Sequence, residues 1–299
     1  MTSIQYINNT SMLIDNGESL LLTDPWYEKL AYGKWLPSPP TCIHPVHLLS
    51  LAQDNVDNFS ILISNSDEDY FDEEYLKLFP KDINIIIPKR KSIWFKETIR
   101  NLGFTKISEI DHRTNINNNK IREHENGVLT IETLDAFIIH CNKNNFFTEE
   151  STISISKHME DYKGRSMHTN GEAYKIILAA QINISEGDYP HIYSNYEDGE
   201  EEVLKNRINK LYIDSINIGA NYLFYYGGHA NFHKENKKIG GFKTSLFYKK
   251  LIKEHLVDKI TFIDLIPGYT FDFEKIYGMF NNYDYSEETL KEQSINFYQ

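Results

Sequence analysis

A short apolar strand that runs directly into an acidic loop is the feature that most constrains the fold of this chain. Residues 59–64 (Phe-Ser-Ile-Leu-Ile-Ser) form an apolar run typical of strands that are covered on both faces. A polar, carboxylate-rich loop follows at 65–72. Two further strands are expected at 83–87 and 106–110, separated by a helix at 93–102. This alternation of strands and helices predicts a sheet with helical cover.

Further strands and helices are expected along the rest of the chain. The remaining predicted strands are 3–8, 11–15, 19–23, 128–134, 136–141, 152–156, 221–226 and 259–265, and the remaining predicted helices are 45–57, 73–79, 200–218 and 242–256. A polar loop or hairpin tip is expected at 113–126, and a polar connection is expected at 157–172. No low-complexity linker interrupts the chain, so we expect one domain over residues 1–299.

The composition argues against several classes of protein. With 31 basic and 43 acidic residues the formal net charge is −12, which disfavours a nucleic-acid partner because phosphates require a basic face. No run reaches the roughly 18 uncharged apolar residues of a membrane-spanning helix. The start lacks a basic and apolar leader, and Cys42 and Cys141 are too few for a disulfide framework. We therefore expect a globular, cytoplasmic protein that binds neither nucleic acid nor membrane.

Asp24-Pro25-Trp26 follows the third strand, and residues 61–64 lead into the acidic loop. This order of short motifs resembles the metallo-β-lactamase fold. In that family this loop carries the pattern H-x-H-x-D-H, which supplies the ligands of one or two metal ions. Asp69 keeps the aspartate of the pattern, whereas its three histidine positions hold Asn65, Asp67 and Tyr70. The resemblance implies an α/β fold, an αββα sandwich of two mixed sheets with helices outside.

Further short motifs follow in order along the chain: Trp35, Pro39-Pro40, Gly187-Asp-Tyr-Pro190, Ala220 to Gly228 and Ile266-Pro267-Gly268. Their order resembles one branch of this family, the metallo-β-lactamase-like part of CMP-N-acetylneuraminate hydroxylase. The resemblance extends over roughly residues 4–275. The chain has no cysteine–histidine pair for a Rieske cluster, so the iron–sulfur module of the full hydroxylase is absent from this sequence.

The resemblance also implies a set of metal ligands. The candidate ligands are Asp67, Asp69, His140, His168 and His233, and the candidate catalytic bases are Glu68 and Asp72. Carboxylates with two or three histidines would suit iron or manganese better than zinc. In this interpretation the site lies in a groove where the loop meets the histidines at the sheet edges. In a hydrolytic version, a bound metal would lower the pKa of a water molecule.

The acidic loop also has a purely structural interpretation. Carboxylates just before a helix stabilise its first turn without any metal, and losing three motif histidines together would destroy an ordinary di-zinc site. Two hypotheses therefore stand. The first is a metal-free or metal-altered pseudoenzyme that binds a small polar metabolite or a protein partner. The alternative is a metal-dependent hydrolase or oxygenase that uses iron, manganese or zinc on a small sugar- or nucleotide-like substrate.

Overall fold

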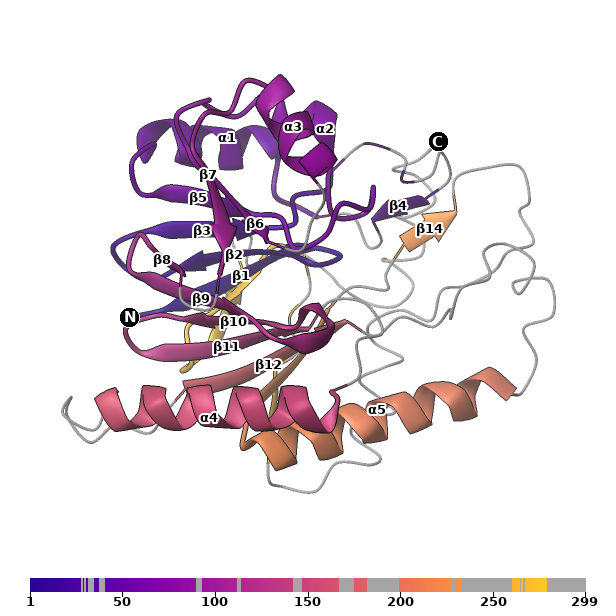
Figure 1. Ribbon diagram of the computed structural model, residues 1–299. Helices are drawn as coiled ribbons and strands as arrows, with labels where there is room; N and C mark the ends of the chain where they lie inside the picture. Colours follow the sequence, from indigo (N-terminus) through magenta and orange to yellow (C-terminus); the bar gives the residue numbers. More distant parts are fainter. Residues whose placement is uncertain are drawn as a thin grey trace.

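The computed structural model of the protein describes most of the chain. The described residues are 1–27, 29, 31, 35–37, 41–89, 93–111, 114–141, 147–166, 175–181, 199–226, 230–232, 260–263, 265 and 267–278. These residues form four layers, with two sheets face to face and helices on both outer sides (Figure 1). The architecture is therefore the αββα sandwich expected from the sequence.

The first sheet is mixed and contains eight described strands. In spatial order they are β17 (Ile276–Gly278), β16 (Tyr269–Phe271), β1 (Ser3–Asn8), β2 (Ser11–Asp15), β3 (Leu20–Thr23), β5 (Phe59–Leu62), β6 (Asn84–Pro88) and β7 (Ile107–Ile110). The strands β3, β5, β6 and β7 run parallel, and the other neighbours are antiparallel. The unbroken apolar runs of β5 and β6 follow from burial on both faces.

The second sheet is also mixed, with seven described strands. In spatial order they are β15 (Thr261–Ile263), β13 (Tyr222–Tyr226), β12 (Lys175–Gln181), β11 (Ala136–Cys141), β10 (Leu129–Glu132), β9 (Asn119–Glu123) and β8 (Thr114–Ile116). From β11 to β15 the strands are parallel, whereas β8, β9 and β10 form an antiparallel meander. A separate two-stranded ladder pairs β4 (Trp35–Pro37) with β14 (Ala230–Phe232).

Helices cover the outer face of each sheet. The helices α1 (Pro45–Asp54), α2 (Glu73–Leu76) and α3 (Ile93–Asn101) lie over the first sheet, and α4 (Glu149–Ser166) and α5 (Gly199–Ile218) lie over the second (Figure 1). A short 3-10 turn at Glu125–Gly127 joins β9 to β10. None of the helices that the structure describes is long and apolar enough to cross a membrane.

The core is divided among the three interfaces between these layers. Along β11, Ile138 packs between the two sheets, whereas its neighbour Ile139 packs under the helices α4 and α5. Between the sheets, the rings of Tyr6 and Phe224 meet edge to face at 5.2 Å. Since side chains alternate along a strand, His140 shares the face of Ile138 and points toward the first sheet.

One predicted strand is wrong. Residues 152–156 lie in α4, and residues 157–166, expected to be a polar connection, continue the same helix. The alternating Ile153 and Ile155 suggested a strand, but Ile153 is 61% exposed while Ile155 and Tyr162, seven residues apart, are buried on one helical face. Thr148 starts the helix by exchanging hydrogen bonds with Ser151, a capping box that overrides the β-branched composition.

The other predicted elements are found in the structure within a few residues, where it describes them. The segment 113–126 is largely a hairpin of β8 and β9, one of the two alternatives expected there. The helix predicted at 242–256 lies outside the described residues. The extent of a single domain over 1–299 stays a prediction.

Candidate functional site

Four buried polar side chains meet at the carboxyl ends of the parallel strands. Asp24 follows β3 and Ser64 follows β5, both in the first sheet. His140 and Tyr226 lie at the ends of β11 and β13 in the second sheet. All four residues are buried. We refer to Ser64, Asp24, His140 and Tyr226 as the buried polar chain, and it connects the two sheets.

Asp24 accepts hydrogen bonds from both sheets. The backbone N–H of Ser64 donates to Asp24 Oδ1 (2.7 Å), and the Ser64 hydroxyl donates to Oδ2 (2.6 Å). His140 Nε2 lies 3.1 Å from the same Oδ2. On the other side of the imidazole, the Tyr226 hydroxyl lies 2.7 Å from Nδ1. The carboxylate of Asp24 therefore has three donors within hydrogen-bond distance.

The direction of these hydrogen bonds follows from the chemistry of the groups. Burial raises the pKa of Tyr226 well above its usual value, and the nearby Cys141 and Asp24 raise it further. The Asp24 carboxylate can only accept, so His140 donates to it from Nε2–H. In the neutral imidazole Nδ1 is then an acceptor, and the protonated Tyr226 hydroxyl donates to it. Both nitrogens of the imidazole are thus engaged in hydrogen bonds inside the protein.

The backbone at Asp24 is shaped to hold this carboxylate in place. Asp24 has a φ of 41°, in the left-handed region that aspartate tolerates better than most residues. Its N–H donates to Leu62 O (2.8 Å), which extends the ladder between β3 and β5 by one step. Pro25 ends the strand there because it has no N–H to donate. The Asp-Pro-Trp motif is therefore a strand end that turns a carboxylate toward the second sheet.

The acidic loop after β5 is closed by its own backbone. The carbonyl of Asp67 accepts from the N–H groups of Tyr70 (2.9 Å) and Phe71 (3.0 Å). Asn65 donates to Asp67 Oδ2 (3.2 Å), and Asn9 from the β1–β2 hairpin donates to the carbonyl of Asp69 (3.0 Å). These contacts hold the loop against the first sheet.

Asp72 has the contacts of a helix-capping residue. Its Oδ1 accepts from the N–H of Tyr75 (3.1 Å), so it caps α2, and its Oδ2 accepts from the N–H groups of Tyr27 (3.3 Å) and Lys29 (3.4 Å). The side chain is buried. Asp72 therefore fastens the loop after Asp24 to the start of α2. The catalytic roles of Asp72 and of the partly exposed Glu68 stay predictions.

The structure places some of the sequence-predicted site residues on adjoining segments. The loop that carries Asp67 and Asp69 begins beside Ser64, which shares the Asp24 carboxylate with His140. His168 and His233 lie outside the described residues. Within the part of the chain that the structure describes, no three His, Cys, Asp or Glu side chains are grouped as metal ligands.

The described donor set does not fit a metal ion. A metal would need the lone pair of His140 Nδ1, which accepts from Tyr226; the donation from Nε2 to Asp24 is a contact that metal-bound histidines also make. At two motif histidine positions, Asn65 offers an amide, a weak zinc ligand, and Tyr70 is fully buried. Coordination by His140 would therefore require one of its two hydrogen bonds to break.

Sequence reasoning missed three members of the buried polar chain. From the sequence, Asp24 is placed only in a motif, and Ser64 and Tyr226 only at the ends of predicted strands. The available signal was positional, because all three stand at the carboxyl ends of strands where polar groups of α/β folds converge. Only the pairing of the two sheets brings them within hydrogen-bond distance.

The sequence comparisons find no relative. No family model matches this chain, and no curated protein is similar to it in sequence. The closer resemblance to the CMP-N-acetylneuraminate hydroxylase branch is not tested by these comparisons and stays a prediction.

Solved structures, by contrast, share its fold. The isothiocyanate hydrolase from Delia radicum gut bacteria is 15% identical over 91% of this chain and 99% of its own, with a TM-score of 0.58. A possible metal-dependent hydrolase from Veillonella parvula is 14% identical with the same coverage and a TM-score of 0.57. The diiron β-hydroxylase CmlA from Streptomyces venezuelae is 12% identical over 93% of this chain and 54% of CmlA, with a TM-score of 0.53. Structural similarity at sequence identities this low establishes the fold but no activity. This chain has the metallo-β-lactamase fold.

Proposed function

We propose that this protein is a metal-free pseudoenzyme of the metallo-β-lactamase fold that acts by binding a small polar metabolite or a protein partner. The observation that carries the proposal is the engagement of both His140 nitrogens, by Asp24 at 3.1 Å and by Tyr226 at 2.7 Å. The buried polar chain joins the two sheets through protein groups alone. A metal is therefore not needed to hold this end of the fold together.

Unpaired polar atoms next to the buried polar chain support a polar ligand. Asn8 Oδ1, Thr10 Oγ1 and Ser11 Oγ are buried and have no hydrogen-bond partner among the described residues. They lie at the tip of the β1–β2 hairpin, where the Thr10 carbonyl accepts from the Thr23 hydroxyl (3.0 Å). A buried polar atom without a partner costs about 1–3 kcal/mol. A buried water molecule, or the polar group of a bound ligand, that supplied these hydrogen bonds would recover that free energy.

The second candidate is a metal-dependent hydrolase or oxygenase acting on a small sugar- or nucleotide-like substrate. It is favoured by the similar folds, which include a possible metal-dependent hydrolase and a diiron hydroxylase. In this alternative Asp67, Asp69 and further histidines would bind iron, manganese or zinc, and the metal would supply Lewis-acid or redox chemistry. The hydrogen bonds of His140 argue against it.

Elemental analysis of untagged protein separates the two candidates. We expect far less than one equivalent of iron, manganese or zinc per chain, before and after incubation with each metal. The double variant Asp67→Asn/Asp69→Asn should leave the metal content unchanged, as should a control that neutralises the exposed Asp54 and Asp57. One or two equivalents of metal, lost in the first double variant and kept in the control, would overturn the proposal.

A pair of matched threonine variants tests whether the Thr10 hydroxyl lacks a partner, which is the premise of the ligand-binding part of the proposal. Thr10 and Thr23 are both fully buried, but among the residues that the structure describes only the Thr23 hydroxyl has hydrogen-bond partners, the Thr10 carbonyl and the N–H of Met12 (2.9 Å). Thr10→Val should therefore leave the free energy of unfolding unchanged or raise it, while Thr23→Val should lower it by about 1–3 kcal/mol. A loss of that size for Thr10→Val would mean that its hydroxyl already serves the fold.

A further inference from the structure

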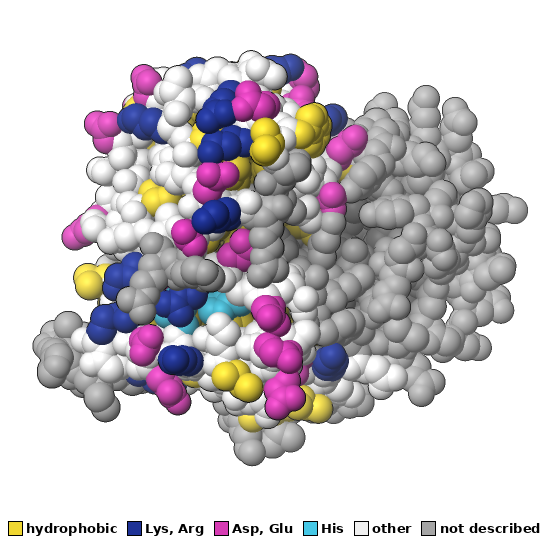
Figure 2. Space-filling view, viewed as in Figure 1, with side chains coloured by type: hydrophobic (Ala, Val, Ile, Leu, Met, Phe, Trp, Pro, Cys, Tyr) yellow, Lys and Arg dark blue, Asp and Glu magenta, His cyan; other side chains and the backbone are white. Residues whose placement is uncertain are grey.

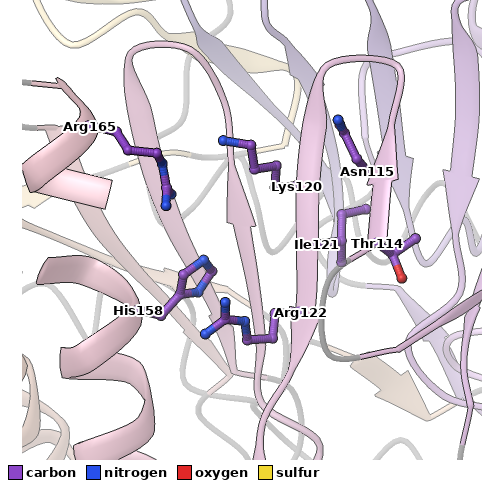
Figure 3. A pocket seen from close by; sticks show the side chains of 7 residues that line it. All are labelled: Thr114, Asn115, Lys120, Ile121, Arg122, His158 and Arg165. Carbon is purple, nitrogen blue, oxygen red and sulfur yellow. The ribbon is translucent and has the colours of Figure 1, made fainter. Parts of the chain in front are cut away.

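A pocket of about 330 Å³ on the outer face of the second sheet is lined by basic side chains. Lys120 and Arg122 come from β9, and His158 and Arg165 come from α4. Figure 3 shows these four side chains pointing into the same space between the strand and the helix. In Figure 2, Lys and Arg side chains gather beside a histidine in the hollow above α4, with acidic side chains scattered around it.

Strand and helix geometry explain why these residues converge. Lys120 and Arg122 are two residues apart on β9 and so share one face of the sheet, while Ile121 between them packs into the core between the sheets. His158 and Arg165 are seven residues apart on α4, which places them on one side of the helix. The pocket lies on the helix-covered face, whereas His140 points to the opposite face. It is therefore separate from the buried polar chain.

The carboxylate of Glu132, on the neighbouring strand β10, holds Lys120 and Arg165 in position. Glu132 is 5% exposed and lies opposite Lys120 in the sheet. Its carboxylate accepts from Lys120 Nζ (2.8 Å) and from Arg165 (2.5 Å), and His158 Nε2 lies 3.5 Å away. Burial alone would raise the pKa of Glu132, but the hydrogen bonds from His158 and Lys120 and the nearby positive charges lower it to about 2. The carboxylate is thus ionised and organises the basic groups around it.

A buried hydrogen-bonded row holds His158 in place. The hydroxyl of Thr130 lies 3.0 Å from His158 Nδ1 and 2.9 Å from His124 Nε2, and His124 Nδ1 lies 2.9 Å from the Ser154 hydroxyl. Burial lowers the pKa of His158, and Arg122 and Arg165 lower it further although Glu132 acts against them. His158 therefore contributes a neutral donor or acceptor at neutral pH and no charge.

The charges around the pocket point to a dianionic ligand. The described residues that line the pocket include three cationic side chains, Lys120, Arg122 and Arg165, and no acidic one, in a chain whose net charge is −12. A phosphate monoester carries about −1.5 to −2 at neutral pH, whereas a carboxylate carries one negative charge. Arginine also presents paired N–H donors that match phosphate oxygens. The pocket volume is near the lower end of ligand sites, which suits a small molecule.

We propose that this pocket binds the phosphate group of a small phosphorylated molecule. Lys120, Arg122 and Arg165 neutralise and grip the phosphate oxygens, and Glu132 holds two of these cations in position. The proposal is independent of the metal-free function proposed above, because the two sites lie on opposite faces of the second sheet.

Calorimetric titration of the full chain at constant ionic strength tests this proposal, with inorganic phosphate as the probe and acetate as the monoanionic comparison. Phosphate should bind saturably and more tightly than acetate. Arg122→Gln and Lys120→Gln should each weaken phosphate binding by about tenfold or more. The control Lys157→Gln, an exposed lysine of α4 outside the pocket lining, should leave binding unchanged.

The proposal is overturned if phosphate does not bind saturably, or if acetate binds as tightly as phosphate. It is also overturned if Lys157→Gln weakens phosphate binding as much as the pocket variants do, or if a short oligonucleotide binds more tightly than phosphate. Thermal unfolding without phosphate shows whether each variant is folded. If the Arg122 variant does not fold, ³¹P line broadening with the unmodified protein, reversed by sulfate and not by acetate, gives the same test.

Discussion

Replacing Asp24 by Asn tests whether the buried polar chain holds the two sheets together. Asparagine has nearly the same shape as aspartate and also tolerates the φ of 41° at this position. The substitution therefore changes charge and hydrogen bonding while the packing is kept. Three donors face the native carboxylate: the N–H and the hydroxyl of Ser64, and Nε2 of His140.

The expected loss of stability follows from counting these donors. If the amide oxygen replaces Oδ1, the NH₂ group faces His140 and the Ser64 hydroxyl; if the amide is flipped, the NH₂ group faces the N–H of Ser64. At least one buried donor loses its acceptor in either orientation. A hydrogen bond to a charged group contributes about 1.5–3 kcal/mol, and removing the buried charge returns part of its desolvation cost. We expect the free energy of unfolding to fall by about 2–4 kcal/mol.

Urea unfolding followed by tryptophan fluorescence and circular dichroism measures this loss. Trp26 is 1% exposed and only two residues from Asp24, so its emission reports on this end of the sheets. The control Asp82→Asn removes an exposed carboxylate and should change stability by less than about 0.5 kcal/mol. A change that small for Asp24→Asn would refute the argument that the buried polar chain links the two sheets.

Three further predictions concern other parts of the fold. Thr148→Ala should destabilise the protein by about 1 kcal/mol by removing the cap of α4, measured by urea unfolding; no change would contradict the capping assignment. Ile138→Ala, between the sheets, should lower the free energy of unfolding by about 2–5 kcal/mol, whereas Ile153→Ala on the exposed side of α4 should change it little. Similar losses for both variants would contradict the burial described. Because the pKa of Glu132 falls from 4.5 to about 2 on folding, its stabilisation is full above pH 4.5 and is lost as the pH falls toward 2. This stabilisation is at most roughly 3 kcal/mol, because the half-exposed Lys120 and Arg165 are screened by solvent. The difference in the free energy of unfolding between wild type and Glu132→Gln should therefore shrink as the pH falls from 4.5 toward 2; a constant difference would contradict the prediction.

The sequence predicted the architecture because the fold is encoded in local patterns. The apolar runs of β5 and β6, the polar loop between them and the period of α5 are all visible in one dimension. The resemblance then supplied the arrangement of the layers. The one clear error, the strand at 152–156, arose because β-branched residues in α4 mimic a strand while its cap at Thr148 was overlooked.

The site was harder to predict because it depends on contacts between distant segments. Asp24 and His140 are 116 residues apart, and Tyr226 is a further 86 residues along the chain. The composition of the acidic loop suggested metal ligands and catalytic bases, whereas in the structure the Asp72 carboxylate caps α2. The basic pocket gave no signal in an acidic sequence, because Lys120 and Arg165 are brought together only when α4 packs over β9.

The imidazole spectrum of His140, in protein labelled with ¹⁵N-histidine, tests most directly whether a metal binds at the buried polar chain. We predict hydrogen on Nε2, hydrogen bonds at both nitrogens, and signals that do not change when one equivalent of zinc or manganese is added; His140→Gln provides the assignment. A shift of the His140 nitrogens on adding zinc, or their broadening by manganese, would show that a metal reaches this imidazole and would contradict the metal-free account.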